Sequence, residues 1–433
     1  MSEVTRTGPA VSDRQAWWER EGLDVRGGRL FVAGRDAGEL ARTHGTPLLA
    51  YDLTHVRERL LALRGAFQRA GLPHRLRVAL KAQRSPELLA VVRALRAPGS
   101  AEAVGLDACS PGEVECGLAA GFLPGEISVT GTNFIDRELE QMLDRGVHIN
   151  ADLVSQLERI GRLAPGSRVG LRVNPQLGAV NRRVGATVYS GARPTKFGLY
   201  AADLERALEV AAHHDLVVDT VDFHVANGML DEDLAAFDRA TAAVAAMTES
   251  LLGAGCPIAE INAGGGLGVA YLPDQRPLDL DAYVAVLKER LGGFGVPVAC
   301  EPGEWVSALA GVLLAEVATV EERLGRCFVG LNVGWNVVDY RMVYGLDVPV
   351  IHATAADAPP VRPVTFAGNI NEGTDLFIED FPFPQVGEGD IVALYGVGCY
   401  TLTCYHPHCL RPPATVVFFA DRVTHEPTTV PLP

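Results

Sequence analysis

Lysine is scarce in this chain. Of the 38 basic residues among 433, three are lysines: Lys81, Lys196 and Lys288. Because arginine supplies nearly all of the positive charge, a lysine kept at the end of an apolar run suggests a need for a deprotonatable amine, as in Schiff-base chemistry. Lys81 has this placement. It follows the run 76–80, which is apolar except for Arg77, and precedes Ser-Pro-Glu at 85–87, which predicts a helix start. The simple alternative is a lysine that reaches from a strand end into solvent.

Long apolar runs and closely paired cysteines are also missing. No apolar run approaches the roughly 18 residues of a membrane span, and the polar N-terminus has no secretory signal pattern, so we expect a cytoplasmic protein. The eight cysteines form no framework of close pairs, which predicts reduced thiols. The net charge of −15 argues against nucleic acid and against a membrane surface as partners.

One segment is dense in potential metal ligands. It holds two histidines and three cysteines: Cys399, Cys404, His406, His408 and Cys409. The spacing fits no closed structural zinc site, and Pro407 would constrain the geometry of any ligand set. We therefore expect a loop that lines a pocket, and no metal.

The first two thirds of the chain alternate between two kinds of segment. Strand-like apolar runs end near residues 81, 109, 130, 149, 173, 224, 262 and 301. Amphipathic segments lie between most of them, at 85–96, 111–121, 136–145, 153–163, 201–214, 231–253 and 279–292. Eight strands that alternate with helices over about 250 residues are typical of a (β/α)₈ barrel, of the α/β class, which we assign to residues 46–305.

The remainder of the chain has a different pattern. Short β-rich segments, separated by Gly and Pro, lie at 312–319, 328–333, 361–366, 391–395 and 415–419. They predict a β-sandwich or small β-barrel of Greek-key type over residues 306–433. Residues 25–45, which include a strand-like run at 29–32, are expected to join this β domain and to carry part of the active site with it. Residues 1–24 are expected to be a lead-in.

Chemically active side chains recur where the predicted barrel strands end. They are Lys81, Asp107 with Ser110, Gly131, Arg172, His224, Gly264 to Gly266, and Glu301. Barrel enzymes build their active sites at the carboxyl ends of their strands. This shared placement makes Lys81 a candidate active-site residue.

The ordered motifs resemble those of a known family. They are 78–82 (Val-Ala-Leu-Lys-Ala), Asp107-x-x-Ser110-x-x-Glu113, 195–198 (Thr-Lys-Phe-Gly), 223–225 (Phe-His-Val), 264–268 (Gly-Gly-Gly-Leu-Gly), 301–303 (Glu-Pro-Gly), Glu372-x-x-Asp375 and 398–400 (Gly-Cys-Tyr). From about residue 17 to 416 the chain resembles the fold-type III pyridoxal 5'-phosphate (PLP) decarboxylases, which act on diaminopimelate and ornithine. The resemblance implies a homodimeric lyase that removes the α-carboxyl group of an amino acid.

The resemblance also implies roles for single residues. Lys81 would hold PLP as a Schiff base, His224 would stack on the ring, and Glu301 would face the pyridine nitrogen and keep it protonated. The glycines, with Tyr400 and Asn227, would bind the phosphate, since a Cβ there would obstruct the backbone N–H groups. Arg172 would lie near the ring, and Asp107 and Glu113 would support the lysine side. The structural alternatives are a core histidine, an ordinary tight turn, an ion pair and structural carboxylates.

Four positions depart from the family pattern. Asn371 replaces a cysteine that ordinarily reaches the partner subunit's site and helps to return a proton, which an amide cannot do at neutral pH. Glu304 replaces an arginine. Tyr340 stands in place of a carboxylate-binding arginine, with Arg341 one place away, and Asp222 replaces a histidine.

These departures predict a different substrate. A second carboxylate would be desolvated without a partner, so meso-diaminopimelate should bind poorly. Glu304 and Glu372 would suit a distal amine or polar group, and Asn371 and Glu372 would reach across a dimer interface. The expected function is α-decarboxylation of a specialised amino acid in secondary metabolism. The alternatives are decarboxylation coupled to transamination or oxidation, and a non-catalytic regulator.

Overall fold

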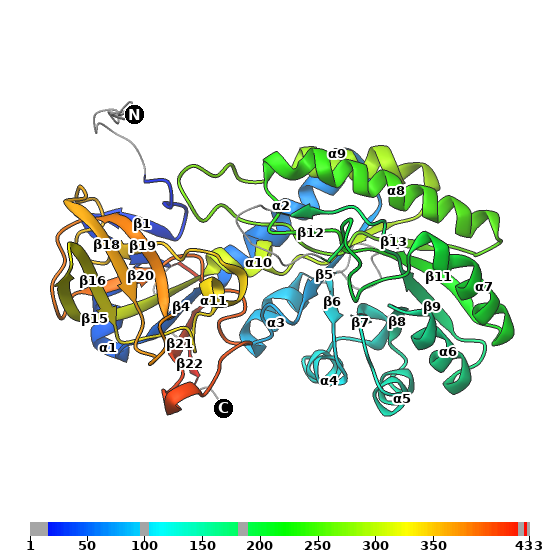
Figure 1. The fold of residues 1–433 in the computed structure, drawn as a ribbon, viewed down its shortest axis with the longest axis horizontal. Coiled ribbons are helices and arrows are strands. Elements are labelled where there is room, and N and C mark those ends of the chain that lie inside the picture. The colour runs from blue at the N-terminus through cyan, green and yellow to red at the C-terminus, as the bar shows by residue number, and fades with distance from the viewer. Residues whose placement is uncertain (1–15, 96–103, 181–188, 423–427, 431–433) are drawn as a thin grey trace.

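A closed parallel barrel forms the larger part of the molecule. The computed structural model describes residues 16–95, 104–180, 189–422 and 428–430. Eight strands close the barrel in the order β11-β13-β14-β5-β6-β7-β8-β9, and every neighbouring pair is parallel (Figure 1). The strands are β5 (His74–Ala79), β6 (Val104–Ala108), β7 (Ile127–Gly131), β8 (His148–Ala151), β9 (Arg168–Arg172), β11 (Val217–Asp222), β13 (Glu260–Asn262) and β14 (Val298–Cys300). The predicted (β/α)₈ barrel is confirmed.

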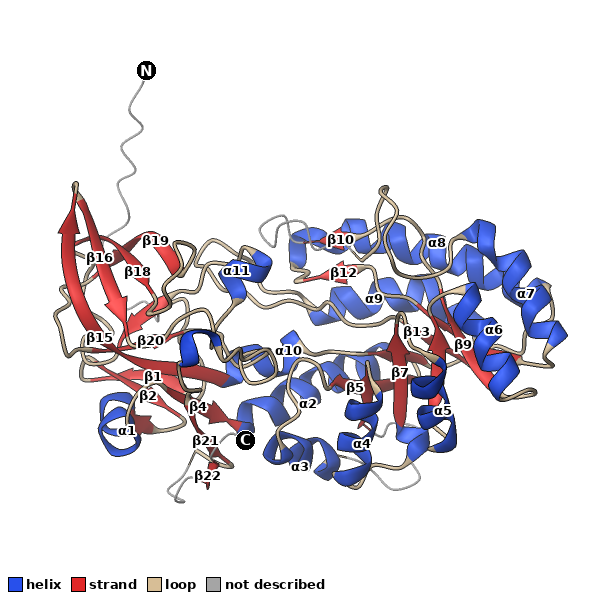
Figure 2. Cartoon of the chain, turned by 60° about the horizontal axis from the view of Figure 1, so that its bottom comes forward, coloured by secondary structure: helices blue, strands red, loops and turns tan. Residues whose placement is uncertain are grey.

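Helices alternate with these strands and lie outside them (Figure 2). They are α2 (Leu53–Ala70), α3 (Pro86–Ala94), α4 (Pro111–Ala119), α5 (Asp136–Asp144), α6 (Val154–Leu163), α7 (Leu204–His213), α8 (Leu234–Gly253) and α9 (Leu280–Leu291). All but α2 coincide with predicted amphipathic segments. The unpredicted α2 begins at its N-cap Asp52, whose carboxylate accepts from Thr54 N, and ends at Gly71 in the left-handed conformation.

A second domain is built on a nine-stranded sheet. Its order is β19-β18-β16-β15-β4-β21-β22, with β17 and β20 paired to each other and β20 also paired to β15. The strands are β4 (Leu48–Asp52), β15 (Gly311–Arg323), β16 (Arg326–Leu331), β17 (Val350–His352), β18 (Arg362–Ala367), β19 (Leu376–Phe383), β20 (Ile391–Leu394), β21 (Thr415–Phe419) and β22 (Thr428–Val430). The predicted β domain is therefore present as a sheet separate from the barrel.

One predicted boundary is wrong. β4 falls inside the expected barrel segment 46–305, but it pairs with β15 and β21 of the other sheet. All five residues of β4 are buried, and all except the last, Asp52, are apolar. This local pattern does not distinguish a barrel strand from a strand of the β domain. The barrel proper begins with α2.

Smaller elements complete the two domains. A three-stranded sheet of β1 (Leu23–Arg26), β2 (Arg29–Val32) and β3 (Arg35–Asp36) is followed by α1 (Ala37–His44). Leu30 N donates to Ala353 O at 2.8 Å, which ties this sheet to the β domain as expected, although β1 begins within the predicted lead-in. The remaining described strands and α-helices are β10 (Ala179–Val180), β12 (Ala226–Asn227), α10 (Glu304–Ser307) and α11 (Tyr340–Tyr344).

The two domains meet at the carboxyl end of β5. Tyr400 N donates to Ala82 O at 2.7 Å, and Thr403 Oγ1 donates to Lys81 O at 2.7 Å. A segment from the β domain is therefore fastened to the turn that carries Lys81.

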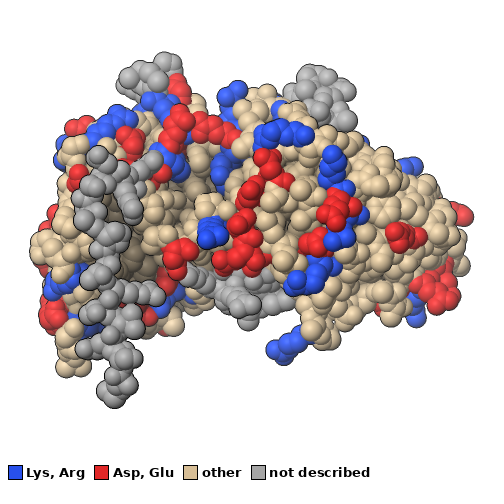
Figure 3. Space-filling model, turned by 90° about the horizontal axis from the view of Figure 1, so that it is seen from above, with Lys and Arg blue, Asp and Glu red and all other residues tan. Residues whose placement is uncertain are grey.

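The surface carries both signs of charge. Acidic and basic side chains are interspersed on the face seen in Figure 3. Among the described helices, none is both long and apolar enough to cross a membrane.

Candidate active site

Lys81 lies in a cavity at the mouth of the barrel. This Lys81 cavity is also lined by Asp107, His224, Glu301 and Tyr400. The pKa of the Lys81 ammonium is held well above its ordinary value, most strongly by the neighbouring Cys109 and also by Tyr400, although burial opposes the charge. Of the other lysines, Lys288 is exposed and donates to Ala70 O, and neither it nor Lys196 lines this cavity. The amine at residue 81 is thus enclosed among groups that can accept a proton or a hydrogen bond.

Glu301 is the first residue after β14, and its side chain is buried. Asn262 Nδ2 donates to Glu301 Oε1 at 2.5 Å from the end of the adjacent strand β13. Burial raises the pKa of Glu301, while this hydrogen bond and then Arg77 and Lys81 lower it. The carboxyl group is fixed in orientation and available to hold or share a proton.

A buried ion pair flanks this carboxylate. Arg172, at the end of β9, lies with Nη1 3.1 Å from Asp152 Oδ1 and Nε 3.8 Å from Asp222 Oδ2. Neither carboxylate oxygen of Asp222 has a hydrogen-bond partner among the described residues, and burial raises its pKa well above the usual range. Arg172 is not among the residues that line the Lys81 cavity, so its predicted place near the cofactor stays a prediction.

His224 follows β11 and is neutral. Gly265 N donates to His224 Nδ1 at 3.1 Å, so this ring nitrogen is an acceptor. Burial lowers the pKa of His224 well below its ordinary value, and the charges of Lys81 and Arg172 lower it further. An uncharged imidazole presents a flat face that suits stacking on an aromatic ring.

The glycine triplet leaves no room for side chains. A Cβ at Gly264 would lie 2.4 Å from Phe223 O, one at Gly265 would lie 2.3 Å from Glu301 O, and one at Gly266 would lie 2.2 Å from Ala226 O. Gly264 and Gly266 also have positive φ, of 64° and 89°. The backbone here can pack closely against the barrel mouth because it lacks side chains.

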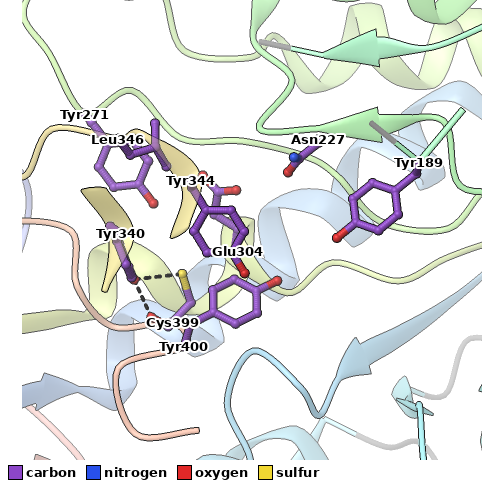
Figure 4. A pocket seen from close by; sticks show the side chains of 9 residues that line it. All are labelled: Tyr189, Asn227, Tyr271, Glu304, Tyr340, Tyr344, Leu346, Cys399 and Tyr400. Carbon is purple, nitrogen blue, oxygen red and sulfur yellow. Dashed lines mark hydrogen bonds between the residues drawn. The ribbon is translucent and has the colours of Figure 1, made fainter. Parts of the chain in front are cut away.

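A second cavity adjoins the first and is rich in tyrosine. This tyrosine cavity is lined by Tyr189, Asn227, Tyr271, Glu304, Tyr340, Tyr344, Leu346, Cys399 and Tyr400, and it shares Tyr189, Asn227, Glu304 and Tyr400 with the Lys81 cavity (Figure 4). Among the described residues, no arginine lines either cavity, and Lys81 is the one cation. A molecule attached at Lys81 could extend into a space walled by hydroxyl groups and one carboxyl group.

Glu304 is the acid of this space. It begins α10, just past the end of β14. Burial raises the pKa of Glu304 to about 7, although the Tyr271 hydroxyl and the backbone of Val269 interact with the carboxyl group and oppose the shift. Near neutral pH, Glu304 can therefore be either a carboxylate or a neutral acid.

Tyr340 also lines the tyrosine cavity. Its hydroxyl donates to Cys399 O and lies 3.1 Å from Cys399 Sγ (Figure 4). Arg341, the next residue, is not at the cavity. Its guanidinium pairs with Asp347 and Glu379, and helical geometry turns it away from its neighbour. The structure therefore offers no support for Arg341 as a substrate-binding residue.

Three other predicted residues lie outside the two cavities. Asn371 and Glu372 are exposed, and Glu372 Oε1 lies 3.5 Å from His408 Nε2. Glu113 accepts from Cys109 N at 2.8 Å, and its own N–H donates to Ser110 Oγ, which is the bonding of a helix cap. The structural alternative thus accounts for Glu113, whereas Asp107 lines the Lys81 cavity.

Sequence reasoning missed several lining residues. Tyr189, Tyr271 and Leu346 lie in loops, and Tyr344 is the last residue of the short helix α11; the sequence analysis predicted no element at these positions. The sequence offered one weak signal for these lining residues. Tyrosines occur shortly after the glycine run 264–268 and just before Gly345. Of the Cys/His segment, Cys399 does line a cavity, as expected of a pocket loop. The His408 ring lies tilted by 38° against the Trp335 ring, with the ring centroids 5.1 Å apart.

The residues present fit PLP. The Lys81 amine can form the covalent link, the glycine triplet provides a close backbone approach for a phosphate, and Glu301 is held for a ring nitrogen. Within the part of the chain that the structure describes, the buried Asp107 Oδ1 has no hydrogen-bond partner, which is consistent with a polar group that joins this cavity.

Comparisons with known proteins agree with this fit. A family model described as the pyridoxal binding domain of pyridoxal-dependent decarboxylases matches residues 53–308. A diaminopimelate decarboxylase from Methanothermobacter thermautotrophicus is 34% identical over 407 residues, which cover 92% of each chain. One from Streptomyces coelicolor is 31% identical over 392 residues, covering 86% of this chain and 84% of its own. The crystal structure of diaminopimelate decarboxylase from Helicobacter pylori with L-lysine has a TM-score of 0.81 at 25% identity and covers 91% of this chain and 95% of its own.

The matched region spans more than half of the chain and begins with α2, where the barrel begins. PLP is the cofactor of this family, and its members decarboxylate amino acids. The chain therefore belongs to the pyridoxal-dependent decarboxylases.

Proposed function

We propose that this enzyme removes the α-carboxyl group of an amino acid whose distal end carries an amine or another hydrogen-bond donor, and that meso-diaminopimelate is a poor substrate. The observation that carries the proposal is the composition of the tyrosine cavity. Its charged lining residue is Glu304, and no arginine is present among the described residues that surround it. The departures from the family's sequence pattern predicted a specialised substrate, and the lining of the tyrosine cavity supports this proposal.

Electrostatics distinguish the two kinds of substrate. A distal carboxylate placed beside Glu304 would lose its hydration without gaining a cation, which costs several kcal/mol. A distal ammonium would gain an ion pair with Glu304 and hydrogen bonds to the tyrosine hydroxyls. Because the pKa of Glu304 is raised to about 7 by burial, a bound cation would also favour its ionised form.

The residues of the Lys81 cavity divide the remaining tasks. When bound, PLP supplies an electron sink for the electron pair left by departing CO₂. Lys81 holds the cofactor covalently, and Glu301, oriented by Asn262, keeps a proton at the ring nitrogen. Neutral His224 covers the ring face without adding positive charge, and the glycine triplet receives the phosphate.

A homodimer is part of the proposal. Asn371 and Glu372 are exposed in the single chain and line neither cavity. Exposed residues of a family motif are suited to complete the site of a partner subunit. Glu372 would then add a second carboxylate for a distal amine.

A substrate panel tests the proposal. The purified enzyme with added PLP is assayed for CO₂ release from lysine, ornithine, arginine, N-acylated diamino acids and meso-diaminopimelate, in both stereochemical series. We expect kcat/KM for at least one amine-ended or polar-ended monocarboxylic substrate to exceed that for diaminopimelate by about 100-fold, which corresponds to an unpaired buried charge. Diaminopimelate as the best substrate would contradict the proposal.

A matched pair of variants sharpens the result. Glu304→Arg places a cation where the family pattern has one, and we expect it to improve diaminopimelate turnover relative to the amine-ended substrate. Glu304→Gln removes the charge without adding a cation, so it should weaken the amine-ended substrate and leave diaminopimelate poor. If neither substitution changed the ratio of the two substrates, Glu304 would not contact the distal group.

A further inference from the structure

Aromatic rings make up most of the lining of the tyrosine cavity. Five of its nine lining residues are tyrosines: Tyr189, Tyr271, Tyr340, Tyr344 and Tyr400. Figure 4 shows these side chains on different sides of Glu304, which carries the one carboxyl group among the described lining residues. The cavity therefore combines several aromatic rings with a single acid.

The rings stand at large angles to one another. Tyr271 and Tyr340 meet edge to face, with their ring planes at 80° and their centroids 6.3 Å apart. The rings of Tyr344 and Tyr400 are tilted by 46°, with centroids 6.0 Å apart. Rings at such angles present their surfaces in several directions to the space that they line.

One lining ring already contacts a cation. The Lys81 ammonium lies over the ring of Tyr189, 6.0 Å from its centroid, which is within the range of a cation–π contact. The same ring meets His224 edge to face, with centroids 4.5 Å apart. The wall of the cavity is therefore able to stabilise positive charge through a ring face as well as through an acid.

The hydroxyl hydrogens of two lining tyrosines are already used within the protein. The Tyr271 hydroxyl donates to the Glu304 carboxyl group, as does the backbone N–H of Val269. The Tyr340 hydroxyl donates to Cys399 O. Because a hydroxyl has one hydrogen, these two tyrosines offer a ligand their rings and oxygen lone pairs, but no donor.

A primary ammonium would use only part of this lining. It is a compact, strongly hydrated ion with three N–H donors, and it would gain the ion pair with Glu304 but little from the rings. Alkyl groups on the nitrogen weaken its hydration and replace N–H donors by C–H groups, which need no acceptor. Such a cation loses less on leaving water and packs against ring faces, which is how aromatic cages recognise methylated amines.

We infer that the distal group of the substrate is an N-alkylated ammonium, held against the tyrosine rings with Glu304 as its counter-ion. The inference rests on the proposed function. It narrows the substrate class from amines and other donors to amines whose distal nitrogen carries methyl or other small alkyl groups.

A methylation series tests the inference. The PLP-loaded enzyme is assayed for CO₂ release from lysine and its Nε-monomethyl, dimethyl and trimethyl derivatives, and from the corresponding ornithine series. We expect kcat/KM to rise along the series, so that the trimethylated member exceeds the unmethylated one by at least about tenfold. An isostere with carbon in place of the trimethylated nitrogen has the same shape without the charge. It should fall at least about tenfold below the charged compound.

A binding measurement does not depend on turnover. The holoenzyme is titrated calorimetrically with 1,5-diaminopentane and with its derivative trimethylated on one nitrogen, which both lack the α-carboxyl group. We expect the Kd of the trimethylated amine to be at least about tenfold lower.

Variants at Tyr344 separate the ring from its hydroxyl, which forms no hydrogen bond with another described residue. Tyr344→Phe keeps the ring and should keep the preference for the trimethylated substrate. Tyr344→Leu removes the ring and should lower the ratio of trimethylated to unmethylated kcat/KM by at least about threefold. Tyr405→Leu is the matched control, because Tyr405 lines neither cavity, and it should leave this ratio unchanged.

The outcomes separate this inference from the proposed function. Diaminopimelate as the best substrate would remove both. A primary amine or arginine that is turned over better than every methylated amine would overturn the inference alone. So would a neutral isostere that matches the charged compound, or an unchanged ratio in Tyr344→Leu. If Tyr344→Leu fails to fold, the methylation series and the calorimetry decide the question.

Discussion

Asn262 joins the acid of the barrel mouth to the glycine turn. Its Nδ2 donates to Glu301 Oε1 at 2.5 Å, and its Oδ1 accepts from Gly264 N at 3.0 Å. Both side chains are buried at the ends of neighbouring strands β13 and β14. The Asn262 amide therefore positions two groups. One is the carboxyl group that is proposed to contact the ring nitrogen of PLP, and the other is the start of the glycine loop that is proposed to bind the phosphate.

Glu301→Gln should separate chemistry from binding. The glutamine side chain can still accept a hydrogen bond from Asn262. It carries no negative charge to stabilise a protonated ring nitrogen, so the cofactor becomes a weaker electron sink. We expect kcat to fall by about 10² to 10⁴-fold, with the PLP dissociation constant changed less than tenfold. Steady-state kinetics and fluorescence titration of apoenzyme measure the two quantities. An unchanged kcat would remove Glu301 from the proposed role.

Lys81→Arg should abolish covalent cofactor attachment. Arginine keeps the positive charge, but its guanidinium is no nucleophile at neutral pH. We expect the absorbance band of lysine-bound PLP to disappear and kcat to fall by at least about 10³-fold, whereas Lys288→Arg on the exposed end of α9 should behave as wild type. Reduction with borohydride and mass mapping of the labelled lysine provide the measurement. A label on Lys196 or Lys288 would refute the assignment.

Gly265→Ala should disrupt the turn. Its Cβ would lie 2.3 Å from the backbone oxygen of Glu301, which cannot move without shifting the barrel strand end. We expect PLP affinity to fall at least about tenfold and stability to drop by 1–3 kcal/mol, as for overpacking. Gly253→Ala is the matched control, because an added Cβ there meets no atom of the described residues within 4 Å and the residue is helical. The control should be neutral or more stable by up to about 1 kcal/mol.

Glu304 should make stability depend on pH. Its pKa is about 7 in the folded protein, raised by burial, and near 4.3 in the unfolded chain. From about pH 4.3 to pH 7 the unfolded chain loses this proton while the folded protein keeps it, so this contribution to stability falls as pH rises and is constant above pH 7. The free energy of unfolding of Glu304→Gln, relative to that of the wild type, should therefore increase by roughly 1–3 kcal/mol when the pH is raised from 5 to 8.

Chemical denaturation at the two pH values measures this difference. Glu321→Gln, at an exposed position on β15, serves as the control and should show no such gain. A Glu304→Gln gain that is equal at both pH values would mean that the pKa of Glu304 is not raised in the folded protein.

Subunit mixing should reveal shared active sites. Lys81→Ala removes the cofactor link, and Glu372→Ala removes a residue proposed to act in the partner's site. If sites are shared, mixed dimers carry one intact site, and an equal mixture should regain about a quarter of wild-type activity. Activity assays after co-refolding or subunit exchange, with light scattering for mass, provide the test. No recovery in verified mixed dimers would place both residues in one chain's site.

The barrel and its lysine were predictable because their signals are local. Strand and helix periods repeat regularly, and Lys81, His224 and Glu301 each lie one or two residues after a strand. In a parallel barrel, strand ends converge whatever their separation in sequence. The placement of these side chains in one region could therefore be predicted before any contact was known.

The sequence could not predict which sheet β4 joins or which residues form the wall of the tyrosine cavity. β4 is buried along its whole length, so its pattern is the same for either sheet, and only pairing with β15 and β21 decides. Tyr271, Tyr340 and Cys399 are far apart in sequence and come from loops and a short helix.

By itself, then, the sequence determined the alternation of strands and helices, the lysine at a strand end and the glycine run, because each depends on neighbours in the chain. The tertiary structure alone decided that Tyr340 turns to Cys399 while Arg341 turns away to Glu379, and that Glu304 lies among tyrosines. The reason is physical. Side-chain direction and desolvation depend on which distant segments pack together, and these segments carry no periodic signal.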